Sequence, residues 1–227
     1  NISMEKEALF LEALPMAMAA KNSGGLVIAQ VERLADRGFL RSREIKIPGI
    51  LVDCVVVAEK PAHHQQTFAV DYNPALDQIM LSPRTYSELW IIDHATTTEE
   101  AAGPAGDLLY RWGNPAVHDA GTPEDRVMFY QHDTQWIPEG YPGVGHVLLY
   151  DNGGDERPYS TVIEIALPLN EDGTYTMTPG EPTGPADFAW QYLADPPEDF
   201  YSALISGAQR QPNGNTLIAE GLNGRLF

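Results

Sequence analysis

One histidine and one arginine in the middle of the sequence could together handle an anion. His132 follows an apolar segment, and Arg157 follows an Asp-Asn-Gly turn at residues 151–153. An imidazole titrates near neutral pH, and a guanidinium offers a planar set of donors to a tetrahedral oxyanion. These side chains predict chemistry on a small anionic group, and Asn152, inside the turn, is a candidate substrate contact.

Both residues also have purely structural explanations. A half-buried His132 can bond the backbone of neighbouring strands, and Arg157 can pair with Asp155 or Glu156. The acidic residues 151–156 offer oxygens that suit calcium, but they lack the ligand spacing of an EF-hand. We therefore expect a plain turn there and no metal site.

The remaining histidines and tryptophans of the second half are expected to be structural. His94 and His118 fall in predicted loops, where we expect no chemical role. Four tryptophans are expected to pack between sheets: Trp90, Trp112, Trp136 and Trp190.

The net charge of -18 is unevenly spread along the 227 residues. Residues 1–66 carry eight basic and eight acidic side chains, so the whole net charge falls on the rest of the chain, where no lysine follows Lys60. Such a shift indicates two segments of different origin. The negative charge argues against nucleic-acid binding. A single cysteine, Cys54, excludes a disulfide framework, and neither a membrane span nor a signal peptide is recognisable.

The first segment has the pattern of a small α/β fragment. Residues 3–20 predict a helix with Ser3 as N-cap, and Pro15 is expected to kink it. Buried strands are predicted at 26–31 and at 50–58, the second of which is rich in β-branched residues, and a short strand is predicted at 45–47.

This segment resembles the propionate and acetate CoA-transferases over residues 1 to about 68. The matching stretches are residues 3–8, 14–25, 31–33, 47–53, 55–58 and 63–68. The resemblance implies a mechanism in which a glutamate forms an acyl-CoA thioester, but the Gly-rich region that carries this glutamate is not found in the sequence. The adjacent His63 and His64 would point to opposite faces of a strand, so a shared site is not expected.

From residue 68 the pattern changes to short strands separated by turns. Strands are predicted at residues 68–72, 78–82, 88–93, 107–113, 127–137, 146–150, 161–165, 188–192, 204–210, 215–219 and 224–227. Units of four strands ending on an aromatic strand are typical of propeller blades. The sequence therefore predicts a mainly β protein: a partial, unclosed β-propeller of about two to three four-stranded blades, preceded by the α/β fragment.

Residues 69–227 resemble the arylsulfotransferase propeller family. The matching stretches are residues 70–74, 89–94, 96–103, 107–115, 131–138, 205–210 and 212–218. The resemblance implies sulfuryl transfer between phenols at a central opening, performed by several histidines and an arginine, one histidine becoming sulfated.

The resemblance carries over to only some of these positions. His132 matches the histidine of the Gln-His motif, and Arg157 matches the arginine after the Asp-Asn-Gly turn. Arg225 occupies the position of the nucleophilic histidine. It can bind an anion, but it cannot form a labile sulfuryl intermediate at neutral pH. Residues 67–69 replace the segment with the family's first histidine.

We therefore divide the chain into residues 1–67 and 68–227, which meet near residue 70. The expected function is that of an arylsulfotransferase-like fragment, inactive in this chain, with His132 and Arg157 catalytic in the family and Arg225 and Asn152 binding substrate. The alternatives are a non-catalytic propeller module that binds an anionic or aromatic ligand, and an inactive CoA-transferase fragment. No cofactor is expected. The expected partner is an aryl sulfate or phenol, and open blade edges predict self-association. The location would be periplasmic or secreted for the propeller segment and cytoplasmic for the first.

Overall fold

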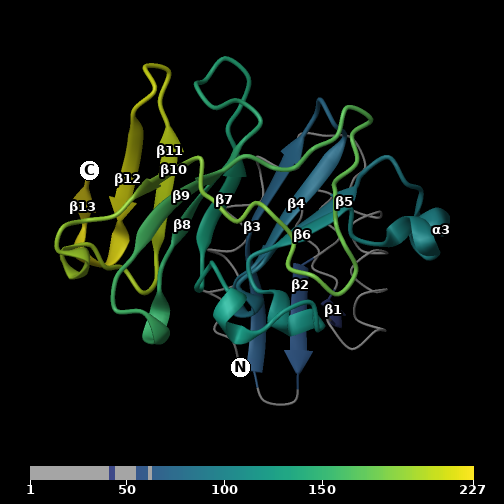
Figure 1. Ribbon diagram of the computed structural model, residues 1–227, viewed down its shortest axis with the longest axis horizontal. Helices are drawn as coiled ribbons and strands as arrows, with labels where there is room; N and C mark the ends of the chain where they lie inside the picture. The colour runs from purple at the N-terminus through teal and green to yellow at the C-terminus, as the bar shows by residue number, and fades with distance from the viewer. Residues whose placement is uncertain (1–40, 44–54, 61–62) are drawn as a thin grey trace. The chain divides into compact units, whose positions relative to one another are not determined.

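The computed structural model describes residues 41–43, 55–60 and 63–227, with side chains from Ala69 onward (Figure 1). The protein is mainly β, which confirms the predicted class, and its strands form three antiparallel sheets. The chain divides into two compact units, residues 1–83 with 90–109 and residues 84–89 with 110–227. The predicted helix at 3–20 and the predicted strands at 26–31 and 45–47 lie outside the described residues. Within the described ranges, no helix has the length and apolar character that crossing a membrane requires.

Strands β1 to β5 follow one another in sequence order in the first sheet. Their bounds are β1 Arg41–Arg43, β2 Val55–Lys60, β3 His63–Asn73, β4 Gln78–Pro83 and β5 Leu89–Asp93. Asn73 Oδ1 accepts the backbone N–H groups of residues 75 and 76 in the turn between β3 and β4. This side-chain bonding is why an Asn-Pro sequence ends β3 and reverses the chain. The short helix α3, Thr98–Ala101, begins with a capping box between Thr97 and Glu100.

The predicted boundary between the two sequence segments falls inside one strand. β3 pairs with β2 from His63 to Gln66 and with β4 from Thr67 to Asn73. The register shifts between Thr67 and Ala69, where a bulge interrupts the ladder. The polypeptide therefore crosses from one pattern to the other without leaving the sheet.

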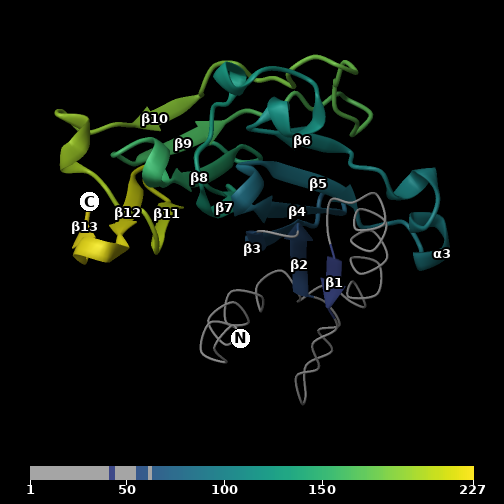
Figure 2. The ribbon, with the colours of Figure 1, turned by 90° about the horizontal axis from the view of Figure 1, so that it is seen from below.

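The second unit contains a four-stranded and a three-stranded sheet (Figure 2). The four-stranded sheet has the order β10-β9-β8-β7, and the three-stranded sheet has the order β11-β12-β13. The bounds are β6 Tyr110–Trp112, β7 His132–Trp136, β8 Val147–Asp151, β9 Thr161–Ile165, β10 Trp190–Tyr192, β11 Ser206–Arg210, β12 Thr216–Glu220 and β13 Arg225–Leu226. Short 3-10 turns connect them: η2 Arg84–Tyr86, η4 Pro115–His118, η5 Pro123–Asp125, η6 Gly154–Glu156, η7 Pro197–Asp199 and η8 Gly221–Asn223.

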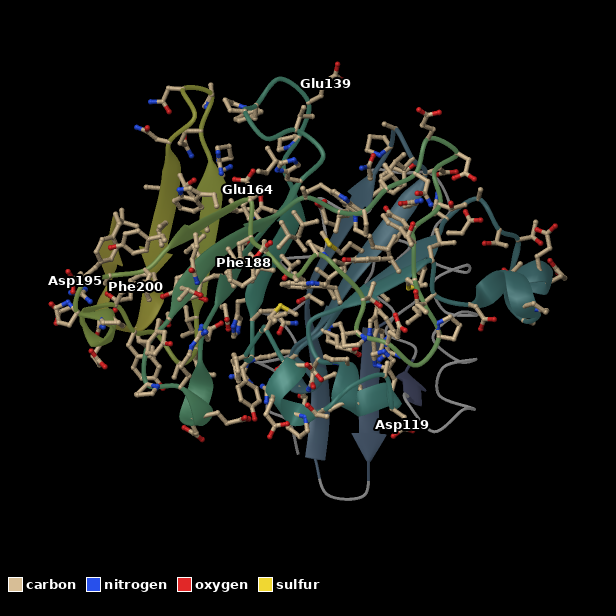
Figure 3. All side chains as sticks on the ribbon, in the orientation of Figure 1. Asp119, Glu139, Glu164, Phe188, Asp195 and Phe200 are labelled. Atoms are coloured by element: carbon tan, nitrogen blue, oxygen red, sulfur yellow. The ribbon has the colours of Figure 1, made fainter. Side chains whose placement is uncertain are left out.

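The two central strands of the four-stranded sheet are buried along their whole length. Every residue of β8 and of β9 is buried, including the polar Asp151, Thr161 and Glu164, so both strands are covered on both faces. Phe200, which is fully buried, packs against Tyr150 and Tyr192 with ring centroids 5.3 and 5.0 Å apart (Figure 3). The same cluster includes Ala208 and Ile218 of the three-stranded sheet. Apolar packing therefore joins the two sheets.

Side chains of β7 also bond the backbone of β11. The Ala208 N–H donates to Asp133 Oδ2 at 2.8 Å, and Gln135 Nε2 donates to the Ala208 carbonyl at 3.0 Å. Both backbone groups of one residue point to the same side of a strand, so in β11 they point away from β12. The first strands of consecutive sheets are thus held together by polar bonds as well as by the core.

Three of the four tryptophans are buried as expected. Trp90, Trp112 and Trp136 are at most 6% exposed, whereas Trp190 is 37% exposed. The Arg210 guanidinium lies 5.7 Å from the Trp190 ring centroid. Trp190 is therefore a surface side chain, which its place on the edge strand β10 explains.

Candidate functional site

His132 begins β7, and the Asn152 side chain holds its ring. His132 Nδ1 lies 2.7 Å from Asn152 Oδ1. Asn152 Nδ2 donates to the Ser202 carbonyl at 2.6 Å and to Ser206 Oγ at 3.0 Å. Because a carbonyl only accepts, the amide nitrogen must face Ser202 and the amide oxygen must face His132. The neutral His132 ring therefore carries its proton on Nδ1 and its lone pair on Nε2.

His132 is uncharged at neutral pH. Burial lowers its pKa from 6.5 to about 4, and the positive charge of Arg84 adds to this shift. Hydrogen bonds with Asn152 and with the backbone of Tyr130 oppose it. A neutral imidazole accepts a proton or a hydrogen bond at Nε2. The chemistry available to His132 is thus that of a base or acceptor, and not that of a cationic anion clamp.

Two arginines that the sequence analysis did not single out lie over the ring of Tyr130. The guanidinium carbons of Arg84 and Arg126 are 5.0 and 5.1 Å from its centroid. Burial lowers the pKa of Arg84. Arg126 Nη1 pairs with Glu156 at 2.8 Å, and the Tyr130 hydroxyl donates to Glu156 at 2.6 Å. Two guanidinium groups and one carboxylate therefore surround one tyrosine of the segment that precedes β7.

Arg157 is held by Asp151, the last residue of β8. Arg157 Nη2 lies 2.9 Å from Asp151 Oδ2, and the guanidinium carbon lies 4.7 Å from the Tyr159 ring centroid. The sequence suggested Asp155 or Glu156 as the ion-pair partner. Arg157 pairs with Asp151 instead, because the chain after the turn folds back and brings Arg157 to the end of the strand. Burial raises the pKa of Asp151 to about 6, although the charge of Arg157 acts in the other direction.

The structure links His132 and Arg157 to two successive residues. His132 is bound by Asn152, and Arg157 is bound by Asp151. Both ends of the Asn152 amide contact protein groups, so Asn152 positions the histidine. Its predicted role as a substrate contact stays a prediction, as do the roles of His132 and Arg157.

Arg225, at the position that the resemblance gives to a nucleophilic histidine, forms an ion pair on β13. It pairs with Glu220, which is fully buried, and Arg225 Nη2 donates to the Asp199 carbonyl at 2.5 Å. Glu220 also accepts the Tyr201 N–H at 2.8 Å. Arg225 therefore fastens the end of β13 to the segment around residue 200.

A second histidine pairs with a carboxylate between the two sheets of the second unit. Glu164 on β9 contacts His146 Nδ1 at 2.7 Å and forms an ion pair with Arg210 of β11 (Figure 3). This group links the four-stranded and three-stranded sheets. In the described part of the chain, no group of three or more His, Cys, Asp or Glu side chains is arranged to hold a metal ion.

Comparison with known proteins finds similarity over part of the chain. The chain is 51% identical to a caffeate CoA-transferase of Acetobacterium woodii over 75 residues, which are 33% of this chain and 14% of that protein. It is 42% identical to the acetate CoA-transferase YdiF of Escherichia coli K12 over 55 residues, 24% of this chain and 10% of that protein. The chain thus spans only a small part of the length of these relatives. No family model matches the chain.

Proposed function

We infer that residues 1–67 are a fragment of a CoA-transferase and that they perform no acyl exchange in this chain. The inference is supported by 51% identity to a caffeate CoA-transferase over 75 residues. That length is close to the extent of the first sequence segment, whose net charge differs from that of the rest. The reaction of these enzymes needs a glutamate that attacks the acyl-CoA thioester, and the region that carries it is not recognisable here.

Isotope exchange tests this inference directly. The full chain is incubated with acetyl-CoA and labelled acetate, then with caffeoyl-CoA and labelled acetate, and label in the acyl-CoA pool is measured. We expect none above a blank, whereas an intact acetate CoA-transferase in the same buffer supplies the positive control. Exchange by the purified chain would show that a nucleophile is present and would overturn the inference.

We further propose that residues 68–227 are an arylsulfotransferase-like propeller fragment that binds a phenol or aryl sulfate at His132 without turning it over. One observation carries the proposal: Asn152 fixes the proton of His132 on Nδ1, and burial keeps the ring neutral. A four-stranded antiparallel sheet followed by a second sheet, with β7 against β11, suits consecutive propeller blades.

The tautomer of His132 determines which ligand group it can bind. Nε2 carries the lone pair, so it accepts the O–H of a phenol. The sulfuryl oxygens of an aryl sulfate need positive charge, which Arg84 supplies beside His132. In a direct transfer the phenol proton would move to Nε2 as the new O–S bond forms and the donor aryl O–S bond breaks. Transfer through a sulfated histidine is not expected, because Arg225 stands at that position.

Binding and turnover are measured separately. Binding of 4-nitrophenol and of 4-nitrophenyl sulfate is followed by the backbone amide signals of the chain in ¹H–¹⁵N NMR spectra, which remain readable when His132 is replaced. Turnover is followed by release of 4-nitrophenolate with phenol as acceptor. We expect binding without turnover, and loss of binding in His132→Ala. The matched control is His146→Ala, which removes a histidine of the same unit and should bind normally.

The outcomes separate an enzyme from a binding module. Turnover that is lost in His132→Ala would establish a transferase and refute the role given to Arg225. Equal binding by wild type and His132→Ala would remove His132 from the site and with it the proposal.

A further inference from the structure

A pocket of about 320 Å³ lies in the second unit, apart from His132. It is lined by β6 and by the turns η4 and η5, together with the segment 182–186. The volume is at the lower end of the range for ligand pockets, so it suits a single ring and not a nucleotide.

Glu88 provides a buried charge at this pocket. Its side chain is fully buried and forms a two-point ion pair with Arg111. His118 Nδ1 lies 3.3 Å from Glu88 Oε1 and has no hydrogen-bond partner. The sequence assigned His118 no role because it falls in a loop, but the fold brings this loop to Glu88, 30 residues earlier in the chain. Glu88 and Arg111 neutralise each other, which leaves His118 as a polar group with unused bonding capacity.

The segment 182–186 of the lining is held in place by two hydrogen bonds. The Tyr110 hydroxyl donates to the Gly184 carbonyl at 2.5 Å, and Trp112 Nε1 donates to the Pro185 carbonyl at 2.9 Å. Two side chains of one short strand therefore hold successive carbonyls of the segment 182–186. A wall held at two points is preorganised, so a ligand would not need to order it.

We propose that this pocket binds a small flat organic cation with one ring and one ammonium group. Trp112, Val127 and the prolines of the lining offer apolar faces to a ring. Glu124 and Asp125 are exposed at the lining, and with Glu88 balanced by Arg111 they give the pocket a negative charge. A negative lining attracts a cation and repels a carboxylate or sulfate.

Benzylammonium is the probe, with benzyl alcohol and benzoate as neutral and anionic matches of the same size. Each is titrated at pH 7 and low salt into the full chain, and the indole N–H signal of Trp112 is followed in ¹H–¹⁵N NMR spectra. Its bond to Pro185 makes this signal sensitive to the pocket wall. We expect the cation to shift the signal in a saturable way, benzyl alcohol to shift it more weakly, and benzoate not to shift it.

Two variants and one control test the site. Glu124→Gln should weaken benzylammonium binding by roughly two- to fivefold, the effect of one exposed charge, and Thr183→Trp should abolish it by filling the pocket. Glu171→Gln, an equal loss of charge at an exposed residue outside the lining, should leave binding unchanged. Equal binding of benzoate, no binding of the cation, or full binding by Thr183→Trp would each overturn the proposal. None of these results depends on what His132 binds.

Discussion

Replacing Asn152 by alanine removes three hydrogen bonds from the centre of the second unit. Its amide bonds His132 Nδ1 at 2.7 Å, the Ser202 carbonyl at 2.6 Å and Ser206 Oγ at 3.0 Å, and the residue is 0% exposed. Each bond contributes about 1 kcal/mol, and a buried group left without a partner costs more. We therefore expect Asn152→Ala to lower the free energy of unfolding by about 3 kcal/mol.

Urea unfolding of the full chain, followed by tryptophan fluorescence and by far-UV circular dichroism, measures this loss. Asn170→Ala is the matched control, because its amide makes a bond to Thr174 on an exposed turn. Exposed turn bonds contribute little, so less than about 1 kcal/mol should be lost there. If Asn152→Ala costs no more than the control, the described bonding of Asn152 is wrong.

A second substitution at the same position tests the contact with His132 specifically. Asn152→Asp places a negative charge beside Nδ1, and an opposite charge favours the protonated ring. The pKa of His132, about 4 in the native protein, should rise clearly when titrated by NMR. An unchanged value would mean that the two side chains do not touch.

Three further predictions concern the same unit. The folded pKa of His132 lies below its ordinary value, so its contribution to stability is present above pH 6.5 and about 3 kcal/mol is lost as pH falls toward 4. The pKa of Asp151 is raised to about 6, so its contribution makes the protein more stable as pH falls from 6 to 4. The two trends oppose each other in the native chain. As pH is lowered, the urea midpoint of Asp151→Asn should therefore fall more steeply than that of the native chain, and the midpoint of His132→Gln should fall less steeply. Phe200→Ala should cost about 3–5 kcal/mol in urea unfolding, because a fully buried ring is lost from the cluster that joins two sheets. Gly153→Ala should lower the melting temperature strongly, since φ is +78° there and a Cβ would lie 2.2 Å from the Tyr159 carbonyl oxygen; an unchanged melting temperature would refute the described turn.

The sequence predicted the strands well where apolar runs are continuous. The predicted strand 161–165 coincides with β9, Thr161–Ile165, because a β-branched run between turn residues leaves little choice. The strand predicted at 127–137 is shorter, His132–Trp136. Tyr130 has a positive φ, which interrupts extended backbone just before β7. Asp133, inside β7, also has a positive φ, and it lies where the register with β8 shifts. The sequence pattern predicts neither.

The candidate site was less predictable, because its partners come from distant parts of the chain. Arg84 influences His132 although 48 positions separate them, and Glu88 meets His118 across 30. Hydrophobic periodicity and turn residues give information about neighbours along the chain and none about contacts between residues far apart in the sequence. Even for Arg157 the sequence offered Asp155 or Glu156 as an ion-pair partner, whereas the pair forms with Asp151 because the partner depends on how the turn closes.

The bonds from Asp133 and Gln135 to Ala208 have a consequence for aggregation. A β-strand with unsatisfied amide and carbonyl groups along its border is a template on which a foreign chain can grow. At Ala208 both groups are already occupied, so growth there would first have to displace two side chains. Fibrillar growth on the border of β11 should therefore be faster in the double variant Asp133→Ala with Gln135→Ala than in the native chain.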